Sequence, residues 1–210
     1  MMKVAGWWMQ DIDNHTAQWA RTGRCPMFTD YYASLKKALE HVNDYEVAID
    51  AGGHVGTWAM EIAKSFDRVI SFEPLEANYE CHELNTKDND KIELVKKALG
   101  AEAGTTGYTI GTSAGAGFTS GEGSIEVVTI DSLELPSCGF IKADIEGHEY
   151  NAFKGAEETI NKYKPVILFE DKGCEQRNLG QERGNAGRYL ESLGYEQKLY
   201  LNRDSLYVWS

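Results

Sequence analysis

The stretch IKADIEGHEY concentrates ionisable side chains directly after a short apolar run. Carboxylate and imidazole groups at this density can ligate a metal, exchange protons with a substrate, or line a cofactor pocket. Alternatively, the stretch is a solvated turn with no binding or catalytic role, in which His148 and Glu149 begin the next helix. The ionisable residues of the stretch are Lys142, Asp144, Glu146, His148, Glu149 and Tyr150.

A second chemical feature is the glycine-rich turn IDAGGHVGTW, in which an acid is followed by Gly52, Gly53 and Gly56. Glycines let the backbone turn tightly and approach a ligand closely. The pattern D-x-G-x-x-x-G differs from the G-x-G-x-x-G of dinucleotide-binding turns, and Asp50 would repel a pyrophosphate. The turn therefore favours a ligand with a cationic amino group and no phosphate, namely S-adenosylmethionine (SAM).

A third candidate is the carboxylate of Glu73 in SFEP, which lies 21 residues after Gly52. At this separation a carboxylate can accept hydrogen bonds from the ribose hydroxyls of a nucleotide cofactor. NAD-binding and SAM-binding proteins share the feature, so Glu73 alone does not discriminate between the two cofactors.

The elements that position these groups alternate between strands and helices. Such alternation predicts a doubly wound, Rossmann-like α/β fold with a mostly parallel sheet, whose ligands bind beyond the carboxyl ends of the strands. The runs YEQKLYL and SLYVW predict an antiparallel strand pair at the C-terminal end. The expected strands are 45–50, 68–72, 92–99, 125–131, 138–144 and 165–170, and the expected helices are 31–43, 55–66, 76–87, 148–162 and one near 182–193.

The chain length fits a single domain, with residues 45–210 as its body and residues 1–44 as an irregular arm and a helix that pack on it. The arm carries Trp7, Trp8 and Trp19, which could form an aromatic lid for a flat-faced acceptor or could serve only in packing. Residues 100–123 contain eight of the 21 glycines, so we expect a mobile loop or a loose hairpin near the site.

Composition narrows the classes of partner. The net charge of −12, without a run of Lys or Arg, argues against nucleic acid as a partner. No apolar run approaches the length of a membrane span, so we expect no membrane partner either. The four cysteines lack a CxxC pair and are typical of reduced thiols in a cytoplasmic protein. Nothing in the sequence indicates an oligomeric state.

Three segments together resemble the FkbM family of class I SAM-dependent methyltransferases: IDAGGHVGTW, SFEP, and FIKADIEGHEYNAFKGAEETI with the later KPVILFE. The hallmarks of the family are a D-x-G-A-N-x-G-like turn, a FEP motif, an IK-x-D-x-EG-x-E segment, a GA-containing helix and a P-x-x-x-x-E strand. The resemblance covers residues 45–170, and its third segment is the most specific. The chain departs from the usual Ala and Asn at Gly53 and His54. The Trp-rich start and the glycine-rich loop look similar to short members from bacteriophage genomes.

The resemblance implies that SAM is the cofactor and that a methyl group is transferred. It assigns the ribose to Glu73, and it places Asp144 near the amino group or the sulfonium. Ala98 and Leu99 would flank the adenine. The methionine end of SAM would be held by Asp50, Gly52, Gly53, His54 and Gly56.

Methyl transfer from a sulfonium is an in-line displacement, in which alignment contributes on the order of 7–11 kcal/mol. A general base adds about 10²–10⁴-fold in rate, so positioning is the larger effect. If the acceptor is a hydroxyl group of a glycan or a small metabolite, Asp144, Glu146 or His148 could take its proton.

Three alternatives to this methyltransferase remain open. Asp144, Glu146 and His148 could instead hold a metal that assists O-methylation, although we expect no metal ligand here, because alternate residues on a turn rarely converge on one ion. The chain could also be a catalytically inactive SAM-fold binding protein. A NAD-dependent oxidoreductase is the third alternative.

Overall fold

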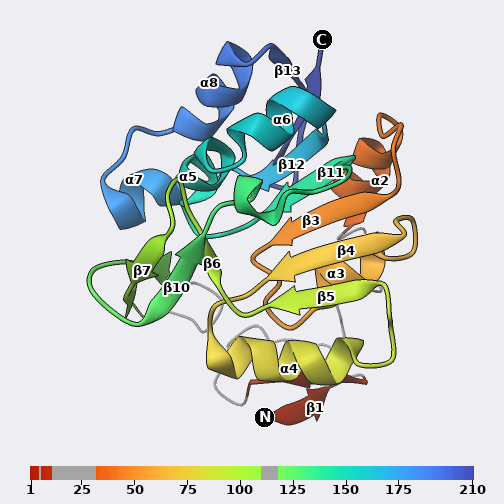
Figure 1. Cartoon of the computed structure of the whole chain (residues 1–210), viewed down its shortest axis with the longest axis vertical. Coiled ribbons are helices and arrows are strands. Elements are labelled where there is room, and N and C mark those ends of the chain that lie inside the picture. Colours follow the sequence, from red (N-terminus) through yellow and green to blue (C-terminus); the bar gives the residue numbers. More distant parts are fainter. Residues whose placement is uncertain (5, 11–31, 110–117) are drawn as a thin grey trace.

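The computed structural model describes residues 1–4, 6–10, 32–109 and 118–210, and a seven-stranded sheet forms its centre (Figure 1). The strand order is β13-β14-β12-β11-β3-β4-β5. The five strands from β12 to β5 are parallel, while β14 runs antiparallel to both β12 and β13. This arrangement confirms the predicted mostly parallel sheet with a C-terminal antiparallel pair. The strands are β3 (Val47–Ala51), β4 (Arg68–Phe72), β5 (Ile92–Val95), β11 (Phe140–Ala143), β12 (Val166–Glu170), β13 (Tyr195–Leu201) and β14 (Asp204–Trp209).

Helices cover both faces of this sheet because successive strand side chains point to opposite sides. Ala48, Phe140 and Leu168 belong to the core that includes α2 (Ala33–Leu39) and α3 (Thr57–Ile62). Ile49 and Ile141 belong to the core on the opposite face. Figure 1 shows the helices of that second face in front of the sheet and α3 behind it. The helices of the second face are α5 (Glu149–Lys154), α6 (Glu157–Tyr163) and α8 (Asn185–Ser192).

Smaller sheets lie beside the main one. The strands β6 (Ala98–Leu99), β10 (Ile125–Val128) and β7 (Gly104–Thr106) form a three-stranded sheet that projects to one side in Figure 1. The hairpin of β8 (Tyr108–Thr109) and β9 (Phe118–Thr119) agrees with the loose hairpin expected within residues 100–123. Residues 110–117 of that prediction lie outside the described part of the chain.

Two predicted elements are wrong as single units. The run 92–99 divides into β5, which pairs with β4, and β6, which pairs with β10. The run 148–162 divides into α5 and α6 at Gly155. A Cβ at Gly155 would lie 2.1 Å from the carbonyl oxygen of Gly100, so the chain passes too closely there for a side chain. The short helix α7 (Cys174–Leu179), ahead of α8, was not predicted.

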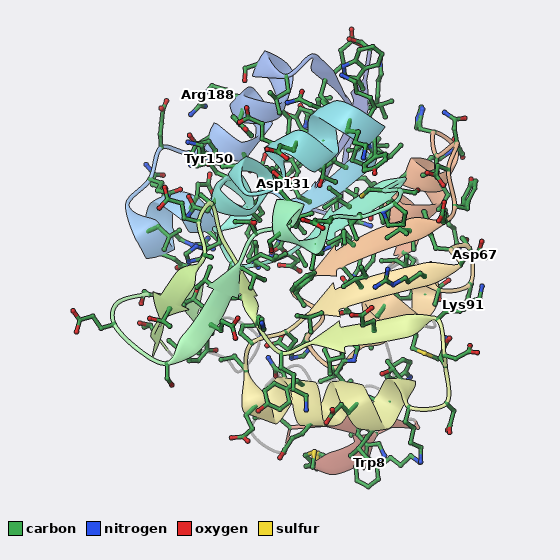
Figure 2. All side chains as sticks on the ribbon, in the orientation of Figure 1. Trp8, Asp67, Lys91, Asp131, Tyr150 and Arg188 are labelled. Atoms are coloured by element: carbon green, nitrogen blue, oxygen red, sulfur yellow. The ribbon has the colours of Figure 1, made fainter. Side chains whose placement is uncertain are left out.

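The described part of the N-terminal arm is a hairpin of β1 (Met2–Val4) and β2 (Trp7–Met9), not an irregular segment. It packs against α4 (Glu76–Thr86): the Trp8 amide donates to Asn85 Oδ1 at 2.8 Å, and Asn85 Nδ2 donates to the Trp8 carbonyl at 2.9 Å. Trp7 is buried in a cluster with Val55 and Cys81. Figure 2 shows Trp8 at the outer edge of the molecule, beyond α4. The packing role therefore fits Trp7 and Trp8, whereas Trp19 lies outside the described residues.

Replacing Trp7 with alanine should lower the free energy of unfolding by about 3 kcal/mol, because a buried aromatic side chain leaves a cavity. Urea titration followed by fluorescence measures this loss. Trp209 is 45% exposed, so Trp209→Ala is the matched control and should cost less than about 1 kcal/mol. An unchanged stability of Trp7→Ala, or a specific loss of acceptor binding, would favour the lid instead.

In the described ranges, no helix is both long enough and apolar enough to cross a membrane. Cys81, Cys138 and Cys174 are buried, as expected for cysteines that pack in the core, and Cys25 lies outside the described residues.

Candidate active site

A cavity of about 410 Å³ lies at the carboxyl ends of the parallel strands. One half is lined from the ends of β3, β4 and β6, and the other half from the ends of β11 and β12 and from the turn between β13 and β14. Tyr108 and Thr119 of the β8–β9 hairpin complete the lining. The predicted residues that the cavity brings together are Gly52, Gly53, His54, Glu73, Ala98, Leu99, Asp144, Glu146 and His148.

The glycine-rich turn allows three strands to meet at this point. A Cβ at Gly52 would lie 2.0 Å from the carbonyl oxygen of Asp144, and its φ of +88° also disfavours a side chain. A Cβ at Gly53 would lie 2.2 Å from Ser71 Oγ. The amides of Gly52 and Gly53 both donate to the Phe72 carbonyl, at 3.0 and 2.8 Å. The turn is therefore closed on β4 and leaves open space above it.

Glu73 is held in a fixed orientation in the half of the cavity that is lined from β3, β4 and β6. Its Oε2 accepts the His54 amide at 2.9 Å. Its Oε1 accepts the Leu75 amide at 2.9 Å and Asn78 Nδ2 at 3.2 Å. Burial raises the pKa of Glu73 to about 7, against the effect of these donors.

Asp50 and Gly56, the other two predicted site residues, lie behind the cavity wall. Asp50 is buried and accepts a hydrogen bond from Ser71 Oγ at 2.9 Å, and Ser71 Oγ lies 3.0 Å from His82 Nε2. Burial raises the pKa of Asp50 to about 6 and lowers that of His82 to about 4. Gly56 precedes α3 and packs against Thr86 and His82. Both predicted residues thus support the turn from beneath and do not line the cavity.

Asp144 lies between the two sets of lining residues, because it follows β11, the strand between β3 and β12. The ammonium of the buried Lys142 is 3.9 Å from Asp144 Oδ2 and 4.7 Å from the centre of the Trp58 ring. Burial opposes the ionisation of Asp144, but the charges of Lys142 and Lys172 outweigh it and hold the pKa of Asp144 below its usual value. Asp144 is therefore a carboxylate at neutral pH.

Glu170 and Lys172 belong to the site, although the sequence analysis did not assign them to it. Lys172 Nζ forms ion pairs with Glu170 and with Glu146, the latter at 3.1 Å. Glu170 shares a hydrogen bond with Asp144, and burial together with the Asp144 charge raises the pKa of Glu170 to about 8. The sequence FEDK could have indicated both residues. Glu170 ends the strand next to β11, so its side chain lies at the same edge of the sheet as Asp144.

Glu146 and His148 face the cavity but are engaged in different ways. Glu146 Oε2 accepts a hydrogen bond from the Cys174 thiol at 3.1 Å, in addition to the Lys172 ion pair. His148 Nε2 lies 2.7 Å from the Thr119 carbonyl oxygen. Because a carbonyl only accepts hydrogen bonds, Nε2 carries the proton and donates it, so His148 anchors β9 over the cavity.

Glu149 closes the loop between Asp144 and α5. Its Oε1 accepts the amides of Ile145 at 2.9 Å and Gly147 at 3.4 Å. Burial raises the pKa of Glu149 to about 7. The side chain therefore fixes the backbone on which Glu146 and His148 are presented.

A metal alternative now involves different residues from those expected. Asp144, Glu146 and His148 do not converge as a ligand group, whereas Glu146, Glu170 and Cys174 offer ligand atoms within 4.8 Å of one another across the described ranges. Lys172 Nζ already contacts the carboxyl groups of both Glu146 and Glu170. The polar atoms of Glu146, Glu170 and Cys174 therefore have partners within the protein.

The buried glutamates predict that stability without ligand falls as pH rises from about 6.5 to about 8.5. Burial raises the pKa of Glu73 and Glu149 to about 7 and that of Glu170 to about 8, so the folded state binds more protons than the unfolded state in this window. The expected loss in free energy of unfolding is on the order of 2–3 kcal/mol. His82 is neutral when folded and opposes the trend only below about pH 6.5.

Urea titrations across this pH window measure the slope. Glu149→Gln should reduce the slope, because one of the three titrating carboxyl groups is removed. A stability that is constant or rises across the window would contradict the prediction.

Comparison with known proteins now decides the family. Residues 50–196 match the family model described as the methyltransferase FkbM domain. The chain belongs to the FkbM methyltransferase family. The match confirms the resemblance seen in the sequence and supports methyltransferase activity, whereas the likeness to bacteriophage members stays a prediction.

A curated relative of this FkbM protein is also a methyltransferase. A hexuronic acid methyltransferase, AglP, of Haloferax volcanii is 26% identical over 157 residues, which are 69% of this chain and 64% of that protein. The chain thus spans less than two thirds of the length of this curated relative.

Solved structures show the same fold. An FkbM methyltransferase from Methylobacillus flagellatus is 22% identical with a TM-score of 0.55, over 78% of this chain and 43% of that one. A precorrin 8w decarboxylase from Methanobacterium thermoautotrophicum is 13% identical with a TM-score of 0.57, over 100% of both chains. A protein from Streptococcus mutans solved in complex with SAH is 11% identical with a TM-score of 0.55, over 85% of this chain and 96% of that one.

Proposed function

We propose that this FkbM-family protein transfers a methyl group from SAM to a hydroxyl group of a glycan or a small metabolite. The observation that carries the proposal is the two-part cavity. One half offers a glycine turn and a fixed carboxylate suited to a nucleoside cofactor, and the other half offers acids and a lysine suited to a polar acceptor. Asp144 lies between the two halves, where a reacting group would be placed.

The residues of the first half fit SAM, which supplies an electrophilic methyl group on a sulfonium when bound. Glu73 has about four acceptor sites on its two oxygens, so its three donors leave capacity for a ribose hydroxyl. Gly52 and Gly53 line the cavity and carry no side chain, so the methionine end would lie against their backbone. Ala98 and Leu99 offer an apolar wall for the adenine.

The same turn supports SAM over NAD. A pyrophosphate is held by free backbone amides of the glycine-rich turn as well as by those at the start of the helix. Here the amides of Gly52 and Gly53 donate to the Phe72 carbonyl, and the His54 amide donates to Glu73. An additional carboxylate, that of Glu73, lies where it would repel a phosphate placed at the His54 amide.

Among the three expected acid–base residues, we assign the proton acceptor to Asp144. It is ionised and lies at the junction of the two halves. Glu146, paired with Lys172, orients the acceptor, and His148 holds the β8–β9 hairpin in place. Alignment of the acceptor by these groups supplies the larger part of the rate enhancement.

The acceptor is inferred from the second half of the cavity. Carboxylates such as Glu146 accept hydrogen bonds from hydroxyl groups, and Tyr108 offers an aromatic ring beside them. The name of the Haloferax relative, a hexuronic acid methyltransferase, supports a carbohydrate as the acceptor class.

Calorimetric titration of the purified protein with SAM and with NADH tests the cofactor. Mass spectrometry of SAH formation with a panel of glycans and metabolites, with and without EDTA, then tests the reaction. SAM binding with EDTA-resistant turnover is the expected result. SAM binding without turnover on any acceptor would indicate a binding protein, NADH binding would indicate an oxidoreductase, and loss of turnover in EDTA would indicate a metal.

A further inference from the structure

The turn between β13 and β14 brings an arginine to the acceptor half of the cavity. Asn202 and Arg203, both with positive φ (55° and 74°), form this tight two-residue turn. Because Asp204 of β14 pairs with Glu170 at the end of β12, the turn lies directly beside Glu170. Both turn residues line the cavity.

The backbone of this turn is anchored although the Arg203 side chain is exposed. The Asp171 amide donates to the Arg203 carbonyl at 2.7 Å, and the Tyr200 hydroxyl donates to the Asp171 carbonyl at 3.2 Å. Asp204 is buried and accepts a hydrogen bond from Ser34 Oγ. The anchored backbone fixes the point at which the Arg203 side chain leaves the turn.

Arg203 also differs from the other cations of the cavity in its charge balance. Lys172 forms ion pairs with Glu146 and Glu170, and Lys97 forms one with Glu126 at 2.5 Å. Across residues 32–109 and 118–210, no ion pair or hydrogen bond engages the Arg203 guanidinium. It is therefore a cation at the acceptor side whose charge the described residues do not balance.

We propose that Arg203 binds the carboxylate of an acidic sugar acceptor, so that a hydroxyl group of the same sugar faces Asp144. The inference rests on the proposed methyl transfer and adds to it the class of acceptor. A guanidinium fits a carboxylate with two parallel hydrogen bonds, which fixes orientation as well as position.

The charges near Asp144 decide which oxygen of the sugar is methylated. A carboxylate placed there would be repelled by Asp144 and Glu146, whereas a hydroxyl can donate its proton to Asp144. The hydroxyl oxygen forms the new bond to the methyl carbon, its proton passes to Asp144, and SAH leaves with the electron pair of the broken C–S bond. The product is a methyl ether, not a methyl ester.

The test compares an acidic probe with its neutral counterpart. SAH-loaded wild type, Arg203→Gln and Arg188→Gln are titrated with methyl β-D-glucuronoside and methyl β-D-glucoside. Arg203→Gln should weaken binding of the glucuronoside about 10-fold and that of the glucoside less than about 2-fold, the size of one lost charge-assisted pair. Arg188 is the matched control: it lies at the outside of α8 in Figure 2, paired with Glu182 at 3.1 Å, and its replacement should change neither affinity.

Wild-type protein that binds both probes equally, or binds neither, overturns the inference, as does an Arg203→Gln variant that retains full preference for the glucuronoside. The methylated product of the glucuronoside should survive mild alkali, and a product that is hydrolysed is an ester and equally overturns the inference. If SAM and SAH do not bind at all, the proposed function fails and this inference with it. If they bind but the acidic probe has no advantage, only this inference fails.

Discussion

Asp144→Asn should lower kcat by about 10²–10⁴-fold at saturating SAM and acceptor, the range typical of a lost general base. The substitution keeps the shape of the side chain but removes the charge that Lys142 and Lys172 stabilise. SAH release under saturating conditions measures the effect. A kcat within about threefold of the wild type would contradict the assignment of Asp144 as proton acceptor.

Glu170→Gln is the matched companion to Asp144→Asn. The amide keeps a hydrogen-bond donor for Asp144, as the protonated Glu170 does, but it cannot titrate. Burial and the Asp144 charge raise the pKa of Glu170 to about 8, so the wild-type rate should rise as pH passes this value and Asp144 becomes more basic. The variant should keep most of its activity at neutral pH and lose this rise. Thermal unfolding of both variants separates catalysis from loss of fold, because Asp144 also faces the buried Lys142.

Glu73→Gln should weaken SAM binding by about 100-fold. The carboxylate is the proposed acceptor for a ribose hydroxyl, and a hydrogen bond to a charged group is worth about 1.5–3 kcal/mol. The amide nitrogen would also face the backbone amide of His54 or Leu75, which both need an acceptor. Isothermal titration with SAM measures the affinity.

The pH dependence of SAM binding supplies an internal control for Glu73. Burial raises the pKa of Glu73 to about 7, and the ribose hydroxyls require its ionised form, so affinity should increase as pH rises through 7. Glu73→Gln should remove this dependence along with most of the affinity. Glu76→Gln, at the exposed start of α4, is the control that should change neither. A wild-type affinity that falls with rising pH would exclude the ribose role.

The sequence was sufficient to predict groups whose role depends on a strand end. Asp50, Glu73 and Asp144 each follow an apolar run, and parallel strands deliver their carboxyl ends to one edge. Whether each side chain lines the cavity or is buried behind its wall could not be predicted in the same way. Asp50 lies within β3, which ends one residue later at Ala51, and its side chain is buried against Ser71.

The features that could not be predicted from the sequence depend on contacts between segments that are distant along the chain. Ala98 continues the β pattern of residues 92–95, but its partner is Val127, so one expected strand serves two sheets. Helical periodicity continues through Gly155, and only the nearby Gly100 carbonyl explains the break. Arg203 reaches the cavity because β14 pairs with β12, a pairing that no local pattern specifies.

The arginine turn lies outside the part of the chain that matches the family model. The family match ends at residue 196, whereas Arg203 lies beyond it, on the hairpin that forms one edge of the sheet. The matched range contains Gly52, Gly53 and Glu73, and it also contains the acids and the lysine on the acceptor side of the cavity. A hairpin exchanged between relatives could therefore redirect the enzyme to a new acceptor while its cofactor machinery stayed intact.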